Sequence, residues 1–440
     1  MSEVVDPSPG PAEAWAALRE CPDCGLFQHL PMLRPGFAAE CIRCGKVLRR
    51  RNRYSFAVTE ALMLAGIALF TILLYAPLMA INVLGRQQGV TLPALPIAFE
   101  QFGMWELSVV VLMFTLLAPV LKLALTAGVL IGLRTEIPSA TLAAMARVRS
   151  WLGPWAMTEV FLLGMFVAYT RLTSYATVMI GPALYAMGAI MMITVAADAW
   201  LDEHALWEAI ARARILRERK DGREHVVATG KTMIGCDTCG LVTAGDIGAP
   251  CFCCGSYLRE RKPDGIARSW ALLFAAAALY IPANLLPVMT IVRLGQTTTS
   301  TILGGVQELI AYQMWPLALL VFVASVVVPI AKLLLLIYML VTTRRRSSHA
   351  LVERTRIYRI VDVIGRWSMI DVFMISILTA LVRMGFLASV IPENGAICFA
   401  GVVILTMLAA ASFDPRSMWD SAGQDGRDAD RAGPLDKVHA

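Results

Sequence analysis

The stretch "LLAPVLKLAL" (residues 116–125) places a lysine, Lys122, inside an apolar segment, and "VVVPIAKLLL" (residues 326–335) does so again at Lys332. Each lysine follows a proline by three residues, and the offset between positions 122 and 332 is 210. A charge inside a segment that could cross a bilayer is costly and is therefore rare without a role. Its occurrence twice, in the same local pattern, predicts an internal repeat.

The repeat extends over most of the chain. The offset of 210 also relates the paired cysteines near residues 41–44 and 251–254, and Met104-Trp105 with Met314-Trp315. At an offset of 212, "WAMTEVF" (155–161) matches "WSMIDVF" (367–373), and "DEHALWE" (202–208) matches "DPRSMWD" (414–420). A fixed period over residue types that are rarely exchanged indicates a duplicated module.

The composition is that of a membrane protein. Of the 440 residues 57% are hydrophobic and 16% are charged, whereas soluble globular chains carry about 25% charged residues. A spanning helix needs about 20 largely apolar residues. Eight spans are expected, two of them short and containing an acid: Phe56–Met79, Trp105–Leu133, Trp155–Thr170, Val178–Leu201, Trp270–Val292, Trp315–Val341, Trp367–Val382 and Leu387–Phe413.

The basic residues are concentrated on one side of these spans. "RRRNR" (49–53), the run from Arg212 to Arg223 and "RRR" (344–346) all fall there, which predicts that this side and both termini are cytoplasmic. Residues 80–104 and 293–314 are then expected outside, and residues 1–55 contain no apolar stretch typical of a cleavable signal peptide. The net charge of +6 mostly reflects this bias. No nucleic-acid partner is expected.

Each module comprises a cysteine cluster and four spans. Four is an even number, so both modules enter the membrane in the same sense and should be related by an axis along the membrane normal. The expected fold class is an all-α polytopic membrane protein with two tandem modules, each a cytosolic zinc ribbon followed by four helices. The expected boundaries are residues 1–18 and 421–440 as disordered tails, ribbons at 19–52 and 231–262, helical modules at 53–207 and 263–420, and a linker at 208–230. The sequence "ALWEAIARARILRERK" (205–220) fits either an interfacial amphipathic helix or a solvated linker helix.

The two cysteine clusters have the spacing of metal sites. "CPDCG" and "CIRCG" give C-x2-C-x16-C-x2-C, and "CDTCG" and "CFCCG" give C-x2-C-x11-C-x2-C. Four thiolates from two tight turns suit a closed tetrahedral zinc site. Rubredoxin-like iron and disulfides are the alternatives, and a reducing cytosol disfavours the latter. We expect two structural zinc ions, held by Cys21, Cys24, Cys41 and Cys44 and by Cys236, Cys239, Cys251 and Cys254.

The expected depth of the lysines argues against the explanation that their side chains simply extend to the membrane interface. Lys122 precedes Arg134 by about 18 Å along a helix, and the apolar core of a bilayer is about 30 Å thick. Lys122 is therefore expected near mid-membrane, where extending the side chain to the interface is strained. Pro119 and Pro329 should kink their helices and free the carbonyl groups of Thr115 and Ser325.

One acid in the third span of each module, Glu159 in the first and Asp371 in the second, is the expected partner of the lysine of that module. We predict the interhelical pairs Lys122–Glu159 and Lys332–Asp371. Static pairs that lock the helices and a polar lining that contacts lipid headgroups or relays protons are both compatible with the sequence. The predicted transport path or polar network comprises Lys122, Glu159, Arg171, Thr115, Lys332, Asp371, Arg383 and Ser325, with Arg171 and Arg383 near the outer interface.

Several of these motifs together resemble a known family. The duplicated plan, the paired CxxCG clusters, "PVLKL" and "PIAKL", "WSMIDVF" and "FDPRSMWD" are similar to the paraquat-inducible protein A family over roughly residues 20–420. The resemblance implies a multi-pass protein of the bacterial inner membrane, with a periplasm-spanning MCE-domain protein as partner. It also implies a role in lipid traffic between the inner and outer membranes, with phospholipid as the cargo.

Three functional classes follow. Lipid transport is favoured. A proton- or ion-coupled small-molecule exporter would use the same lysines and acids, and a membrane scaffold would use the ribbons to recruit partners. The sequence contains no nucleophile–base set, phosphate-binding loop or nucleotide motif, so we do not expect an enzyme.

Overall fold

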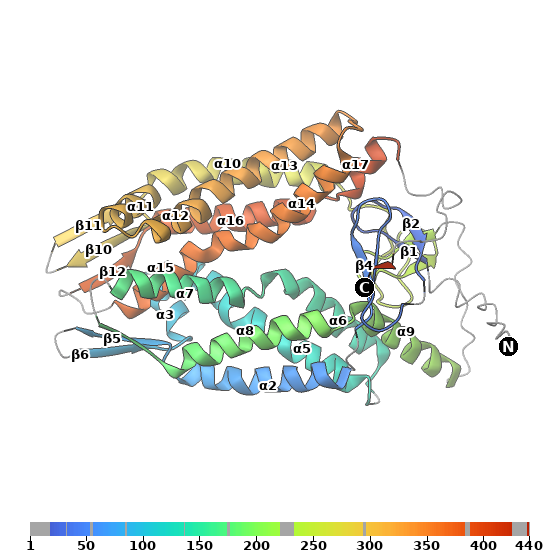
Figure 1. The fold of residues 1–440 in the computed structure, drawn as a ribbon, viewed down its shortest axis with the longest axis horizontal. Coiled ribbons are helices and arrows are strands. Elements are labelled where there is room, and N and C mark those ends of the chain that lie inside the picture. Colours follow the sequence, from blue (N-terminus) through green and yellow to red (C-terminus); the bar gives the residue numbers. More distant parts are fainter. Residues whose placement is uncertain are drawn as a thin grey trace.

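The two modules lie side by side with their helices roughly parallel to one long axis (Figure 1). Both cysteine clusters lie at one end, here called the ribbon end, and two small sheets lie at the other, the sheet end. The shared direction of the two modules confirms the parallel repeat. The computed structural model describes residues 18–31, 33–52, 56–83, 86–135, 137–173, 177–220, 233–293, 296–382, 388–424 and 438–439.

The helices of the two modules follow the same order. In the first module they are α2 (Phe56–Tyr75), α3 (Ala94–Glu100), α4 (Trp105–Val111), α5 (Ala118–Gly132), α6 (Ser139–Leu152), α7 (Thr158–Thr173) and α8 (Pro182–Trp200). In the second they are α10 (Gly265–Leu285), α11 (Ile302–Ala311), α12 (Trp315–Phe322), α13 (Val328–Arg344), α14 (Leu351–Gly365), α15 (Ile370–Leu381), α16 (Asn394–Ser412) and α17 (Arg416–Ser421). Two short 3-10 turns, Gly153–Trp155 and Arg366–Met369, precede α7 and α15.

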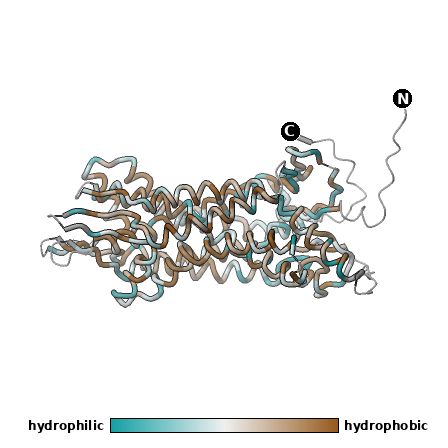
Figure 2. The backbone as a smooth tube through the Cα atoms, turned by 90° about the horizontal axis from the view of Figure 1, so that it is seen from below, coloured by the Kyte–Doolittle hydropathy of each residue, from teal (hydrophilic) through white to brown (hydrophobic). Residues whose placement is uncertain are grey.

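The described residues contain seven helical stretches that are long and apolar enough to cross a membrane: Phe56–Tyr75, Trp105–Gly132, Ser139–Thr173, Pro182–Trp200, Gly265–Leu285, Trp315–Arg344 and Asn394–Ser412. Hydrophobic residues dominate the middle of the molecule and polar residues its ends (Figure 2). The chain is therefore a multi-pass membrane protein. The expected span at 367–382 corresponds to α15, which has only 12 residues, all of them buried. Because each of its residues is buried, α15 lies inside the protein.

Two three-stranded antiparallel sheets form the sheet end. The strands are β5 (Met79–Val83), β6 (Arg86–Val90) and β7 (Thr177–Ile180) in the order β6-β5-β7, and β10 (Met289–Arg293), β11 (Gln296–Ser300) and β12 (Ala388–Pro392) in the order β11-β10-β12. The boundaries of four expected spans at the sheet end were therefore wrong, because these residues form strands. The first helix stops at Tyr75 and the fifth at Leu285, while the fourth starts at Pro182 and the eighth at Asn394.

Residues related by the repeat meet at the centre of the molecule. The rings of Phe161 and Phe373 pack edge to face, with centroids 5.4 Å apart. Gly164 permits this approach, because a Cβ atom there would lie 3.1 Å from the Cβ of Phe373 and 3.2 Å from the carbonyl oxygen of Ile370. A pseudo-twofold axis therefore passes between α7 and α15.

A π-helical turn precedes each of the two prolines. These turns are Leu112–Leu117, before Pro119, and Val323–Val327, before Pro329. Within them the hydroxyl of Thr115 donates to the carbonyl of Val111 at 2.7 Å. Proline removes the backbone donor that would bond four residues back, and a widened turn accommodates the loss.

The cysteine clusters are built on short strands. These are β1 (Leu18–Glu20), β2 (Phe27–His29), β3 (Ala38–Glu40) and β4 (Val47–Arg50) in the first ribbon, and β8 (Met233–Gly235) and β9 (Val242–Ala244) in the second. The expected tails at 1–18 and 421–440 lie mostly outside the described residues. Val438–His439 (β13) pairs with β3.

Each ribbon packs on the other module. The cysteines of the first ribbon share an apolar cluster with Met339 of α13 and Trp419 of α17. Those of the second ribbon share one with Leu142 of α6 and with Trp207. Trp207 belongs to α9 (Glu203–Lys220), which crosses the expected boundary at 207 and packs against the second ribbon. The exchange ties the two modules together at the ribbon end.

Candidate functional site

The eight predicted metal ligands form two compact groups. In each group the four sulfur atoms lie within 4.8 Å of one another, and all eight cysteines are buried. The glycine after the second cysteine of each knuckle has a positive φ, as at Gly25 (+73°), where its N–H donates to the carbonyl of Cys21 at 2.9 Å. Only glycine adopts this conformation without strain. Each group can hold a metal ion, and four thiolates leave no position for a substrate.

Glu20 links the two ribbons to the second module. Its Oε1 accepts hydrogen bonds from Arg416 at 3.1 Å and Arg261 at 3.2 Å, and its Oε2 accepts one from the backbone N–H of Gly235 at 3.1 Å. Burial raises the pKa of Glu20, although both arginines act in the opposite direction. The carboxylate is therefore a structural junction of the ribbon end.

A cavity of about 910 Å³ lies between the modules at the ribbon end. It brings the two repeat-related lysines, Lys122 and Lys332, into one space. We call it the polar cavity; the charged residues that line it are Lys122, Arg147, Arg149, Glu159, Asp198, Glu203, Asp237, Lys262, Lys332, Asp362 and Arg366. No sequence pattern indicated that the two lysines would line the same cavity.

The predicted pair Lys122–Glu159 is wrong. Lys122 instead bonds Asp198, in the last turn of α8, with Nζ 2.5 Å from Oδ2. The expected depth of Lys122 stays a prediction; seven residues further along α5, Val129 and Leu130 pack in the cluster of the second ribbon. An acid near the end of a span, in "VAADAW", was the signal that sequence reasoning overlooked.

Lys332 does not pair with Asp371 either. It is only 2% exposed, and its Nζ donates to the hydroxyl of Thr406 on α16 at 3.0 Å. Gly365, at the end of α14, makes room for it, because a Cβ atom there would lie 2.7 Å from Nζ. Thr406 was missed by the sequence analysis.

Asp371 and Ser325 are the two predicted residues that meet inside the second module. Asp371 is 5% exposed, and its Oδ2 accepts a hydrogen bond from the hydroxyl of Ser325. Its Oδ1 is buried and has no hydrogen-bond partner among the described residues. The repeat-related residue Glu159 is exposed, so the two acids occupy different environments.

Arg171 connects the modules near the sheet end. Its side chain is 7% exposed, and its Nη2 lies 3.2 Å from Oε2 of Glu308 on α11. Glu308 was not predicted, although it is the one acid in the apolar helix "ILGGVQELIA". Arg383 lies outside the described residues.

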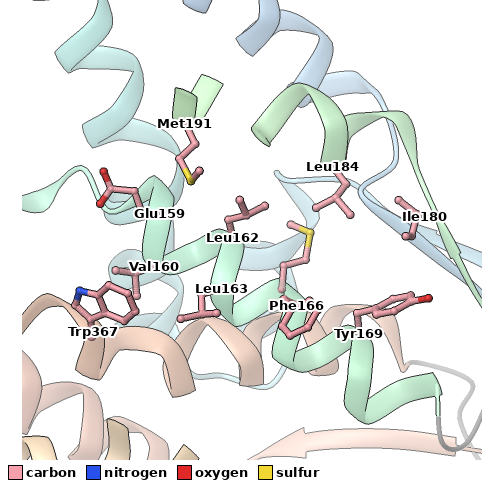
Figure 3. A pocket seen from close by; sticks show the side chains of 11 residues that line it. Glu159, Val160, Leu162, Leu163, Phe166, Tyr169, Ile180, Leu184, Met191 and Trp367 are labelled. Atoms are coloured by element: carbon pink, nitrogen blue, oxygen red, sulfur yellow. The ribbon is translucent and has the colours of Figure 1, made fainter. Parts of the chain in front are cut away.

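An apolar groove of about 780 Å³ runs along α7 and α8 (Figure 3). Glu159 and Trp367 lie at one end of the groove, and Tyr169 and Ile180 lie at the other. The residues that line it are Glu159, Val160, Leu162, Leu163, Met165, Phe166, Tyr169, Ile180, Leu184, Met191 and Trp367. Among the described residues that line the groove, Glu159 is the only one with a charged side chain.

Glu159 lines both the groove and the polar cavity, so the two spaces adjoin at this residue. From Thr158 to Thr173 α7 rises about 24 Å, compared with a bilayer core of about 30 Å. The junction lies at the ribbon end of α7, because Glu159 is in the first turn of that helix. An apolar groove that adjoins a charged cavity has the shape and polarity to accommodate an amphipathic molecule.

The model of the paraquat-inducible protein A family matches residues 57–211 and 266–423. The chain belongs to the paraquat-inducible protein A family. The intermembrane transport protein PqiA of Escherichia coli strain K12 is 33% identical over 406 residues, which cover 91% of this chain and 95% of that protein. The lipophilic envelope-spanning tunnel protein A of the same strain is 27% identical, over 92% of this chain and 91% of that protein. A probable intermembrane transport protein of Haemophilus influenzae is 25% identical, over 91% of this chain and 95% of that protein. No solved structure matches this chain significantly.

The two matches to the paraquat-inducible protein A family coincide with the two helical modules and exclude both cysteine clusters. In this member of the family the modules have diverged at the site. The acid of the first module, Glu159, faces the groove, whereas Asp371 of the second is enclosed by the interior of the protein.

Proposed function

We propose that this protein passes phospholipid between the bacterial inner membrane and a periplasm-spanning MCE-domain protein. The acyl chains occupy the apolar groove and the headgroup occupies the polar cavity. The observation that carries this proposal is that Glu159 lines both spaces. The names of relatives as intermembrane transport and envelope-spanning tunnel proteins support the same conclusion.

The size and surroundings of the two spaces support a lipid cargo. Their volumes, about 780 and 910 Å³, fall in the range of about 300–1,000 Å³ that is usual for ligand sites. Trp151 and Trp155 line the polar cavity and Trp367 lines the groove. Tryptophan is enriched at the membrane interface, so a lipid could enter from the leaflet with its headgroup already at the depth of the cavity.

Lys332 places a positive charge at a defined position in the lining of the cavity. It is buried in the second module, bonded to Thr406, and still borders the cavity. Ionisable groups inside a bundle usually serve a pathway. In the proposed mechanism Lys332 attracts the phosphate of the headgroup, while Ser325 and Asp371 hold the adjacent helices.

The ribbon end is assigned to the cytoplasm and its two cysteine groups to zinc. The basic loops gather at this end, as the positive-inside rule requires. Buried tetrathiolate groups with tight knuckles are typical of structural zinc. Their exchanged packing then holds the cytoplasmic ends of the two modules at a fixed distance.

The proposal is tested by filling the groove. Leu163→Trp and Leu184→Trp add bulk inside it, whereas Leu319→Trp adds the same ring on α12, where Leu319 is 63% exposed. In cells, transfer of radiolabelled phospholipid between the inner and outer membrane fractions should fall in the two groove variants and not in the control. Protein abundance should stay the same in all three. Normal transfer in both groove variants would contradict the proposal.

A further inference from the structure

Most charged groups of the polar cavity already have partners inside the protein. Lys122 bonds Asp198, and Arg149 bonds Asp198 and Glu203. Asp237 bonds Arg416. The two remaining lysines donate to uncharged oxygens: Lys262 to the carbonyls of Ala411 and Phe413, and Lys332 to Thr406.

Four charged groups of the cavity are left without an ion pair or a side-chain hydrogen bond among the described residues: Arg147, Arg366, Glu159 and Asp362. Two are positive and two are negative, and Lys262 and Lys332, which bond only uncharged oxygens among the described residues, add two further positive charges. The Nε of Arg147 is buried and has no hydrogen-bond partner in the part of the chain that the structure describes. A buried donor without a partner is destabilising. A ligand that supplied both an acceptor and a donor would satisfy all four groups.

The position of these groups relative to the groove limits what that ligand can be. Arg366 lines the cavity and its neighbour in sequence, Trp367, lines the groove. Glu159 lines both. A lipid with its chains in the groove must therefore place its headgroup among these charges.

We propose that the polar cavity selects a zwitterionic glycerophospholipid that carries a primary amine. The phosphate is held by Arg147 and Arg366, and the ammonium group donates to Glu159 and Asp362. An anionic headgroup without an amine offers neither carboxylate an ammonium donor, and a choline headgroup has no N–H to donate. This inference rests on the proposed lipid path and adds the class of headgroup.

Lipid competition on the purified full-length protein tests the selectivity. The protein is loaded with phosphatidylethanolamine bearing a fluorescent acyl chain, which is then displaced by unlabelled phosphatidylethanolamine, phosphatidylglycerol or phosphatidylcholine with identical chains. A charge-assisted hydrogen bond contributes about 1.5–3 kcal/mol, which is about tenfold or more in affinity. Phosphatidylethanolamine should therefore compete about tenfold better than either of the other two lipids.

The variants assign the selectivity to named side chains. Glu159→Gln together with Asp362→Asn should abolish the preference for phosphatidylethanolamine over phosphatidylglycerol, and Arg147→Gln together with Arg366→Gln should weaken both lipids. Glu353→Gln and Arg356→Gln change exposed residues of α14 that do not line the cavity, and they should match the wild type. Thermal melting of each variant shows whether it is folded.

The outcomes separate this inference from the function on which it rests. Equal competition by the three lipids, or an unchanged preference in the acid double variant, would overturn the headgroup assignment and leave the lipid path standing. Failure of the wild-type protein to bind the fluorescent lipid would overturn both.

Discussion

The ring of Phe161 packs edge to face on the ring of Phe373, at an interplanar angle of 73°. The two residues occupy the same position in the two copies of the repeat, so the contact lies on the pseudo-twofold axis. Around it, α15 is wholly buried, whereas α7 leaves the groove open on one side. At this position the second module is therefore closely packed, whereas the first module has an open groove.

Adding bulk at the axis should destabilise the protein. Gly164→Leu would force its side chain against Phe373 and the backbone of Ile370, and overpacking of this kind costs about 1–3 kcal/mol. The melting temperature of the purified protein should fall. Gly188→Leu is the control, because nothing lies within 4 Å of its Cβ position. Equal melting temperatures for the two variants would show that the axis is not tightly packed.

The repeat supplies a matched test for Lys332. In Gly365→Ala the new methyl group would lie 2.7 Å from Nζ, so the lysine must move away from Thr406. Phospholipid transfer should fall while abundance stays near the wild-type level. Gly153→Ala, at the equivalent position of the first module, meets nothing within 4 Å and should be tolerated. The reverse order of severity would argue against a role for Lys332.

Because each ribbon packs on the other module, a substitution in the second module should change the metal content of the first ribbon. Arg359, on α14 of the second module, bonds Asp23 at 2.5 Å and the carbonyl of Cys44 at 3.2 Å. Metal analysis should find two zinc ions per wild-type chain. Arg359→Ala should lose zinc from the first ribbon alone, whereas Arg356→Ala, an exposed residue on the same helix, should retain both ions. Two ions in Arg359→Ala would mean that the ribbon does not need this support.

The ion pair between Arg171 and Glu308 should matter more for stability than its position near the surface implies. Glu308→Gln leaves the buried guanidinium of Arg171 without its counter-charge, and such a loss costs about 3–5 kcal/mol when the pair is fully desolvated. Glu308 is 29% exposed, so we expect the lower part of that range in thermal denaturation. Arg171→Met combined with Glu308→Gln should recover most of the loss. A double variant less stable than the single one would indicate a further role for Arg171.

The repeat made the architecture predictable, but not the pairing of its parts. Matching "PVLKL" with "PIAKL" shows which residues are equivalent and that both modules run in the same direction. It cannot show which ribbon packs on which module, because equivalent surfaces accept either copy. The exchange depends instead on tertiary contacts such as Trp207 and Trp419 with the cysteine clusters.

The partners of the buried lysines and the outer strands were harder to predict. Spacing along the chain did not identify Asp198 as the partner of Lys122, because tertiary packing decides which helices face each other. The strands at Met289–Arg293 and Gln296–Ser300 carry the signal of β-branched residues around a short turn. The first of these strands directly follows the apolar residues of α10, so in the sequence it was read as a continuation of the spanning helix.

The central claim, that lipid occupies the groove, is tested most directly by photo-crosslinking from two adjacent positions of α8. Benzoylphenylalanine at Leu184 would face the groove, and at Tyr185, which is 71% exposed and does not line it, would face the surroundings. After detergent exchange removes loosely held lipid from the protein purified out of radiolabelled cells, illumination should attach phospholipid at position 184 and not at 185. Absence of lipid at 184, or equal labelling at the two positions, would contradict the account.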